Sequence, residues 1–257
     1  MIKESNRFIS SCIFEGMTSI RAIIDNLKAN VPNARKVEKI LFDKEKASKK
    51  AKELGYLRKM GELFGFPVEE SNESEISSLS IGASHGGIIA ICSERNYPML
   101  DVKSIKENGF YVMIEGIEDP YNFGYAMRSI YASGVDGFIF SKRNWLSAAG
   151  VVCRSSAGAS ERAEIYIATD NFIEIFKSKD YKVVCADIKN SISIYDADLK
   201  KPIFLIVGGE KRGISSSVLS NADQIVRIDY GREFDAALSA ASASTIIAFE
   251  VFKQNNK

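Results

Sequence analysis

Asn122, Gly124 and Arg128 are closely spaced in a segment that follows a strand-like run. Asp119-Pro120 ends that strand, because proline disfavours helical backbone in the residue before it. Asn122 then stands where the N-cap of a helix is expected. An arginine near the start of such a helix presents a planar, permanently charged donor to a phosphate or a ribose oxygen. The alternative is a solvated arginine on an ordinary helix, and this segment alone does not decide between the two.

The helix after Asn122 is expected to bury one face. Its apolar residues recur at the i, i+3, i+4, i+7 spacing of an amphipathic helix. They are Phe123, Ala126, Met127 and Ile130. Arg128 lies about 140° from Phe123 around the helix axis, so it should point away from that face. Gly134 suits the helix C-terminus.

A second candidate segment, residues 203–215, is a buried strand that ends in Gly208-Gly209, continues through Glu210 and closes at Gly213. Adjacent glycines at the carboxyl end of a parallel strand allow a ligand to approach the backbone closely. A tight turn between strand and helix would explain these glycines equally well. The chain has neither G-x-G-x-x-G after its first strand nor G-x-x-x-x-G-K-[ST], so a Rossmann dinucleotide site and a P-loop are not indicated.

A third segment, residues 225–252, runs from a strand through a loop into a helix whose first turns, from Asp235, are mostly alanine and serine. Small residues permit close packing against a ligand or a partner helix. They also suit tight packing within one chain, and the sequence leaves these possibilities open.

The elements that must position these segments follow a regular order. Short apolar runs alternate with helical or polar segments from residue 110 onward. These runs are residues 110–114, 137–140, 165–168, 182–186, 203–207 and 224–228. Buried strands that alternate with helices predict a mostly parallel α/β sheet covered on both faces.

The first part of the chain predicts a smaller α/β domain. Residues 36–43 alternate like a strand, a lysine-rich helix follows and ends at Gly65-Phe66-Pro67, and two more strand-like runs come after it. The first 30 residues show only weak patterning. We therefore expect two domains, residues 1–105 and 106–257.

Composition limits the classes of function. With 46% hydrophobic and 26% charged residues, the chain of 257 residues is typical of a soluble globular protein. Four scattered cysteines and one histidine argue against a zinc or other metal site and favour free thiols in a reducing cytoplasm. No signal peptide or membrane-spanning run is apparent, so we expect a cytoplasmic protein without a membrane partner.

Because the formal net charge is only +1, a site for a polyanion must be a local patch. Between Arg35 and Lys59 there are ten basic residues against four acidic ones. Such an excess suits an RNA backbone, and it equally suits a solvated helix face.

Together, the three segments resemble the SpoU/TrmH family of SPOUT RNA methyltransferases. The family's first motif, N-x-G-x-x-x-R, is matched by Asn122, Gly124 and Arg128. Its second, an apolar residue followed by G-x-E-x-x-G, is matched by Val207, Gly208, Glu210 and Gly213. A small-residue element, S-A-G-A, is matched by residues 156–159.

The family's third motif is present in altered form. Ile228-Asp229-Tyr230 stands for I-P-M, and residues 237–241 stand for S-L-N-V-S. Ser239 occupies the place of the usual asparagine, and the loop before Leu238 is about one residue longer than usual. The single histidine, His85, is expected to belong to a structural turn in the substrate-binding domain.

The resemblance implies a SPOUT domain whose C-terminal part forms a trefoil knot, which is rare among proteins. It also implies S-adenosylmethionine as cofactor, RNA (rRNA or tRNA) as substrate and a homodimer in which Arg128 reaches across the interface. Cofactor contacts are carried over to Ala186, Gly208, Ile228 and Leu238. The catalytic set is carried over to Arg128, Asn122, Glu210 and Ser239.

The reaction implied by the resemblance is methylation of a ribose 2′-hydroxyl. Arginine stays protonated to a pH of about 12 or above, so Arg128 is expected to act as an electrostatic clamp rather than as a base. Two alternatives stay open: methylation of a base, and an RNA-binding protein that has kept the fold without catalysis.

Overall fold

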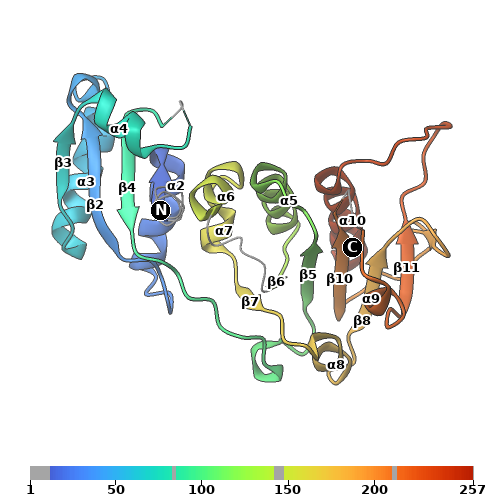
Figure 1. Ribbon diagram of the computed structural model, residues 1–257. Coiled ribbons are helices and arrows are strands. Elements are labelled where there is room, and N and C mark those ends of the chain that lie inside the picture. Colours follow the sequence, from blue (N-terminus) through green and yellow to red (C-terminus); the bar gives the residue numbers. More distant parts are fainter. Residues whose placement is uncertain (1–11, 83–84, 142–147, 210–212, 257) are drawn as a thin grey trace, which may run out of the picture. The chain divides into compact units, whose positions relative to one another are not determined.

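The structure, a computed structural model, describes residues 12–82, 85–141, 148–209 and 213–256 (Figure 1). Contacts within the chain divide it into two compact units. The small unit comprises Met1–Asn96 and Asn144–Arg162, and the large unit comprises Tyr97–Arg143 and Ala163–Lys257. The chain thus leaves the small unit, returns to it for a short segment and leaves it again. The expected pair of continuous domains divided at residue 105 stays a prediction.

The small unit is built on a four-stranded mixed sheet in the order β1-β4-β2-β3. Its strands are β1 (Ile13–Glu15), β2 (Val37–Asp43), β3 (Val68–Ser71) and β4 (Ile88–Cys92). Its helices are α2 (Gly16–Lys28), α3 (Ala51–Phe64), α4 (Glu73–Leu79), α6 (Ala149–Ser155) and α7 (Ala159–Arg162), with a short 3-10 turn, η1 (Lys44–Lys46).

Alternating side chains bury both faces of this sheet. Phe14 and Phe42 belong to a core shared with α2, α3 and α6, whereas Leu41 and Ile89 pack with Ile76 of α4. The predicted helix terminator is confirmed, because Gly65 caps α3 in the left-handed conformation at φ +78°. Strand β1 and helix α2 form where the sequence shows only weak patterning.

A buried ion pair fastens α7 to the rest of the small unit. Arg35 donates from Nε to both carboxylate oxygens of Glu161 at 3.1 Å, and both side chains are 2% exposed. The backbone oxygen of Glu161 accepts hydrogen bonds from Asn26 at 2.6 Å and from Arg95 at 2.9 Å. These bonds compensate for burying the charges, whose desolvation would otherwise be costly.

The S-A-G-A element, residues 156–159, makes a close contact in the same place. A Cβ added at Gly158 would lie 2.6 Å from the Cβ of Ala22 on α2. Gly158 also has a φ of +85°, which residues with side chains rarely adopt. In this structure the small residues of this element serve packing against α2.

The large unit contains a seven-stranded sheet in the order β7-β6-β5-β10-β8-β11-β9, and every adjacent pair is parallel. The prediction of a mostly parallel sheet is confirmed. The strands are β5 (Phe110–Glu115), β6 (Gly137–Phe140), β7 (Ile165–Ile167), β8 (Lys182–Ala186), β9 (Ile192–Ser193), β10 (Ile203–Gly208) and β11 (Gln224–Arg227). Only the two-residue strand β9 has no counterpart among the predicted strands.

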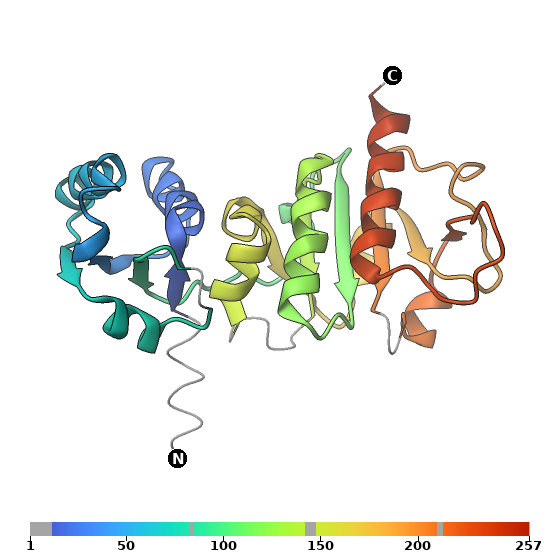
Figure 2. The same ribbon diagram turned by 90° about the horizontal axis from the view of Figure 1, so that it is seen from above.

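Helices cover both faces of the large sheet. They are α5 (Pro120–Ala132), α8 (Phe172–Lys177), α9 (Ser216–Leu219) and α10 (Ala240–Asn255), and a 3-10 turn, η2 (Val102–Ser104), precedes β5. On one face Phe176 of α8 and Val218 of α9 share a core with Met113, Phe204 and Ile206. Helices α5 and α10 pack against each other, and α10 contacts β10 (Figure 2).

Helix α5 begins slightly earlier than predicted. Its N-cap is Asp119, whose carboxylate accepts a hydrogen bond from the backbone N–H of Asn122 at 3.0 Å. The prediction of Asn122 as the N-cap is therefore wrong. Aspartate is a strong N-cap, and Pro120 has no N–H to satisfy at the first helical position. The predicted apolar face is buried, and Arg128 is exposed on the other side.

The trefoil knot stays a prediction. In the described part of the chain, no helix is both long enough and apolar enough to cross a membrane.

Candidate active site

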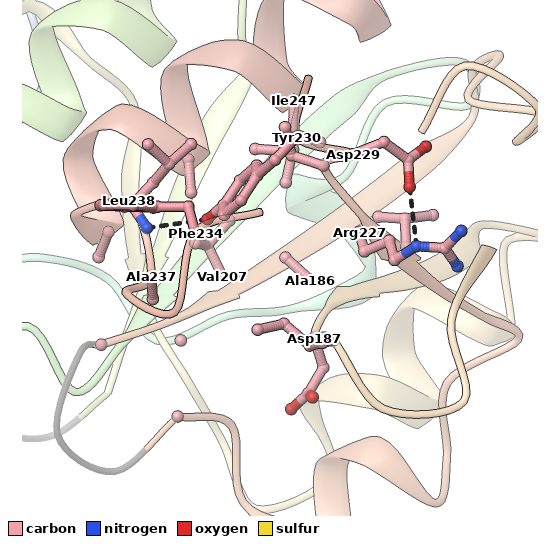
Figure 3. Close-up of a pocket in the computed structure, with 18 residues that line it drawn as sticks. Ala186, Asp187, Val207, Arg227, Asp229, Tyr230, Phe234, Ala237, Leu238 and Ile247 are labelled. Carbon is pink, nitrogen blue, oxygen red and sulfur yellow. Dashed lines mark hydrogen bonds and ion pairs between the residues drawn. The ribbon is translucent and has the colours of Figure 1, made fainter. Parts of the chain in front are cut away.

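A pocket of about 510 Å³ lies at the carboxyl ends of β8, β10 and β11 (Figure 3). These three strands are neighbours in the large sheet, in the order β10-β8-β11, and they run parallel. Their carboxyl ends therefore lie at the same edge. Such an edge is the usual place for ligands in open α/β sheets. The volume is within the range of about 300–1,000 Å³ that is typical of small-molecule sites.

The four residues predicted to contact a cofactor all line this pocket. Ala186 ends β8, Gly208 ends β10, Ile228 follows β11, and Leu238 comes just before α10. They are separated along the chain and brought together by the sheet. That they bind a cofactor stays a prediction.

The four residues predicted to be catalytic are not gathered in the same way. Asn122 and Arg128 lie on α5, and neither lines the pocket of its own chain. Ser239 is flanked by the lining residues Leu238 and Ala240 but does not itself line the pocket. Glu210 lies outside the described residues.

Ser239 has a clear structural role as the N-cap of α10. Its hydroxyl accepts a hydrogen bond from the backbone N–H of Ser242 at 3.1 Å and donates to the hydroxyl of Ser242 at 3.0 Å. Asparagine and serine are comparably good N-caps. Serine in place of the usual asparagine therefore preserves the start of this helix.

The paired glycines after β10 permit close crossings of the backbone. A Cβ on Gly208 would lie 2.6 Å from the carbonyl carbon of Gly213, and a Cβ on Gly209 would lie 2.1 Å from the carbonyl oxygen of Gly116. Real Cβ atoms do not approach other atoms so closely. Other parts of the chain therefore approach these glycines closely, and the predicted contact of Gly208 with a ligand in the pocket stays a prediction.

Two carboxylates, Asp187 and Asp229, line the pocket, and the sequence analysis assigned a site role to neither. Asp187 lies directly after β8, and its carboxylate accepts a hydrogen bond from the N–H of Lys189 at 3.0 Å. Asp229 accepts from Nε of Arg227 at 2.9 Å (Figure 3). The hydroxyl of Ser193 and the charge of Arg227 lower the pKa of Asp229, so this carboxylate is ionised at neutral pH. An acidic residue directly after a strand was the signal available for Asp187.

The loop after β11 carries two aromatic side chains at the pocket. The hydroxyl of Tyr230 accepts a hydrogen bond from the backbone N–H of Leu238 at 3.0 Å (Figure 3). The ring centroids of Tyr230 and Phe234 are 6.1 Å apart. The hydrogen bond joins the start of the loop to its end.

These groups fit a nucleoside that carries a positive charge. Val207, Val226 and Ile247 give the pocket an apolar wall suited to a purine ring. The carboxylates of Asp187 and Asp229 offer acceptors for ribose hydroxyls or an ammonium group. The residues present are therefore compatible with S-adenosylmethionine.

A parallel α/β domain with a pocket at its strand ends, whose sequence has neither G-x-G-x-x-G after the first strand nor a P-loop, differs from a Rossmann dinucleotide-binding domain. The SpoU rRNA Methylase family matches residues 109–249, which is more than half of the chain. The chain therefore belongs to the SpoU rRNA methylase family. Residues 15–98 match the family described as RNA 2′-O ribose methyltransferase substrate binding.

Relatives from several bacteria cover most of the chain. A protein of Staphylococcus saprophyticus named as a TrmH family tRNA/rRNA methyltransferase is 29% identical over 196 residues, 74% of this chain and 78% of the relative. An uncharacterized tRNA/rRNA methyltransferase of Borreliella burgdorferi is 28% identical over 232 residues, 84% of this chain and 98% of the relative.

Solved structures share the fold. The AdoMet-bound rRNA methyltransferase of Sinorhizobium meliloti has a TM-score of 0.76 at 22% identity, covering 98% of this chain and 94% of its own. The SpoU methyltransferase AviRb of Streptomyces viridochromogenes, in complex with AdoMet, has a TM-score of 0.76 at 21% identity, covering 94% of this chain and 89% of its own. The predicted cofactor, S-adenosylmethionine, is thus confirmed for the family.

Proposed function

We propose that this protein transfers a methyl group from S-adenosylmethionine to a ribose 2′-hydroxyl of ribosomal or transfer RNA. The observation that carries the proposal is the pocket, where Ala186, Gly208 and Ile228 from three strand ends meet Leu238 from the loop before α10. Its second support is the match of residues 15–98 to a substrate-binding family of RNA 2′-O ribose methyltransferases. A solved RNA 2′-O ribose methyltransferase also shares the fold, with a TM-score of 0.72 at 20% identity.

When bound, the cofactor supplies an electrophilic methyl group on its sulfonium. The protein must hold the acceptor hydroxyl in line and stabilise the negative charge that develops on its oxygen while the hydroxyl proton passes to water. Arg128 is suited to this task because its guanidinium is permanently charged and can clamp ribose and phosphate oxygens at once. We assign it to charge stabilisation rather than to proton removal.

Arg128 would act in the pocket of a second copy. It lies on the exposed side of α5, and α10 packs beside α5. Together these two helices expose large aromatic side chains, each 38–51% accessible. They are Tyr121, Tyr125, Tyr131, Phe249 and Phe252. We propose that a second chain covers this surface, which we call the α5/α10 surface, in a homodimer.

RNA capture is proposed for the small unit. Of the ten basic residues between positions 35 and 59, Arg35, Lys39, Lys46 and Arg58 are held in ion pairs. Five others are exposed and form no ion pair with the described residues: Lys36, Lys44, Lys49, Lys52 and Lys59. These ammonium groups are available to neutralise RNA phosphates. Because the substrate is RNA and Cys92, Cys153 and Cys185 are buried free thiols, we propose the cytoplasm as its compartment.

The test is methyl transfer to RNA from a strain that lacks this gene. The purified protein is incubated with total ribosomal and transfer RNA and S-adenosylmethionine labelled in its methyl group, and the RNA is digested to nucleosides for mass spectrometry. We expect label in one 2′-O-methylnucleoside. Label on a nucleobase would instead support base methylation. Cofactor binding and RNA binding without transfer would overturn 2′-O-methyl transfer and point to an RNA-binding role.

A further inference from the structure

The loop between β11 and α10 places an exposed aromatic ring at the mouth of the pocket. Phe234 lines the pocket and is nevertheless 58% exposed, so part of its ring faces outward. Ile188, another lining residue, is 71% exposed. A single exposed apolar side chain is common on protein surfaces. Two at the mouth of one pocket indicate a surface that something apolar covers.

The ring of Phe234 is held near the pocket by its loop. Tyr230 lines the same pocket, and its hydroxyl bonds the N–H of Leu238, which closes the loop around Phe234. The rings of Tyr230 and Phe234 lie 6.1 Å apart and are tilted by 56°, an arrangement that aromatic pairs favour. Ser239 then starts α10, so both ends of the loop are anchored.

We propose that Phe234, supported by Tyr230, is a stacking platform for the base of the RNA nucleotide whose ribose is methylated. This inference rests on the proposed function. The acceptor ribose must reach the mouth of the pocket, and its base is attached to the same sugar. Unstacked RNA bases are commonly held on aromatic side chains. The platform therefore belongs to substrate binding, although Phe234 and Tyr230 line the same pocket as the residues assigned to the cofactor.

The first test compares variants of the full-length protein. Stacking on an aromatic residue is worth about 1–3 kcal/mol per base, so Phe234→Ala should raise the KM for total RNA from the deletion strain about 5- to 150-fold. Phe234→Trp should keep the wild-type KM, whereas Phe234→Leu, apolar but not aromatic, should resemble alanine. The matched control is Tyr195→Ala: Tyr195 is 59% exposed in the same unit but does not line the pocket. It should leave the KM unchanged.

A second test does not depend on turnover. Trp145 is the only tryptophan of the chain, so Phe234→Trp combined with Trp145→Phe reports on position 234 alone. Total RNA from the deletion strain should quench its fluorescence. Absence of quenching, or an unchanged KM in Phe234→Ala, would overturn the platform.

Two further measurements distinguish other positions for the ring. Calorimetry should show the same S-adenosylmethionine affinity in Phe234→Ala as in wild type. A loss of cofactor affinity as large as the rise in KM would mean that the ring covers the cofactor instead. Sedimentation should show the same oligomeric state, and dissociation would assign the ring to a subunit interface. If RNA quenches the Phe234→Trp/Trp145→Phe variant but wild type methylates no RNA, the proposed function fails, and Phe234 remains an RNA contact without a role in methyl transfer.

Discussion

At the scale of single residues, the proposed role of Arg128 depends on a second copy of the chain. Its helix leaves it exposed, and the pocket of the same chain does not include it. A residue so placed contributes little to the packing of the core. We expect its role to lie in contacts with RNA and with the pocket of a second chain.

We predict that Arg128→Ala lowers the rate of methyl transfer by about 10²–10³-fold, the usual cost of removing an electrostatic donor in a transition state. Cofactor affinity should be unchanged, because the guanidinium is not part of the chain's own pocket. Single-turnover kinetics and calorimetry measure the two effects. Arg128→Lys keeps the charge without the planar fork. High activity in that variant would show that charge alone suffices, and loss of cofactor affinity in Arg128→Ala would contradict its placement.

Gly208 is required by contacts within the chain. In Gly208→Ala the new methyl group would press on the backbone of Gly213, and such overpacking costs about 1–3 kcal/mol. We expect a melting temperature lower by several degrees and a weaker affinity for S-adenosylmethionine, measured by calorimetry. The control is Gly231→Ala, where an added Cβ meets nothing within 4 Å. Equal melting temperatures and equal cofactor affinities in the two variants would refute the close contact between Gly208 and the backbone of Gly213.

At the scale of elements, the two ends of the strands have different roles: one end forms the pocket and the other is fixed by ion pairs and hydrogen bonds. The carboxyl ends of β8, β10 and β11 form the pocket. The amino end of β5 is fixed by Asp136, which lies just before β6. Its carboxylate accepts bonds from the N–H of Phe110 at 2.8 Å and from Lys106 at 2.7 Å, with Lys201 at 3.4 Å.

These contacts predict how stability depends on pH. Partial burial by itself would raise the pKa of Asp136, but the hydrogen bonds from Lys106 and Phe110 outweigh it, and the pKa is lowered. A lowered folded-state pKa contributes stability that is complete above the unfolded value of about 3.9 and is lost as the pH falls below it. We expect the stability difference between wild type and Asp136→Asn to be constant from pH 7 to about 5 and to shrink below about pH 4.

Urea denaturation across this pH range measures the difference. A difference that grows as the pH falls would have the wrong sign and would show that the carboxylate is not stabilised in the folded state.

At the scale of the whole molecule, the α5/α10 surface decides whether a second copy completes the active site. We predict that the protein sediments as a dimer at micromolar concentration and that Tyr125→Asp dissociates it, because the variant buries a charge in an apolar interface. Leu63→Asp is the control: Leu63 is 65% exposed, but it lies on α3 of the small unit. A wild-type monomer, or dissociation by Leu63→Asp alone, would contradict this interface.

The sequence by itself determined most of the large sheet, because a buried strand records its environment as a run of apolar side chains. The sequence predicted the strands from β5 to β11 with the exception of β9. It also predicted the exposed side of α5 and the position of Gly208 and Leu238 at one pocket. The glycine cap of α3 was visible because a left-handed backbone selects glycine.

Tertiary structure decided what local pattern cannot record. The bond between Arg35 and Glu161 joins residues 126 positions apart, and it holds α7 in the small unit although the chain before residue 144 and after residue 162 belongs to the large one. The close approach of Gly213 and Gly116 to the glycines at the end of β10 became known only with the path of the backbone. The reason is physical: periodicity reports whether a side chain is buried, whereas its partner is set by how distant segments pack.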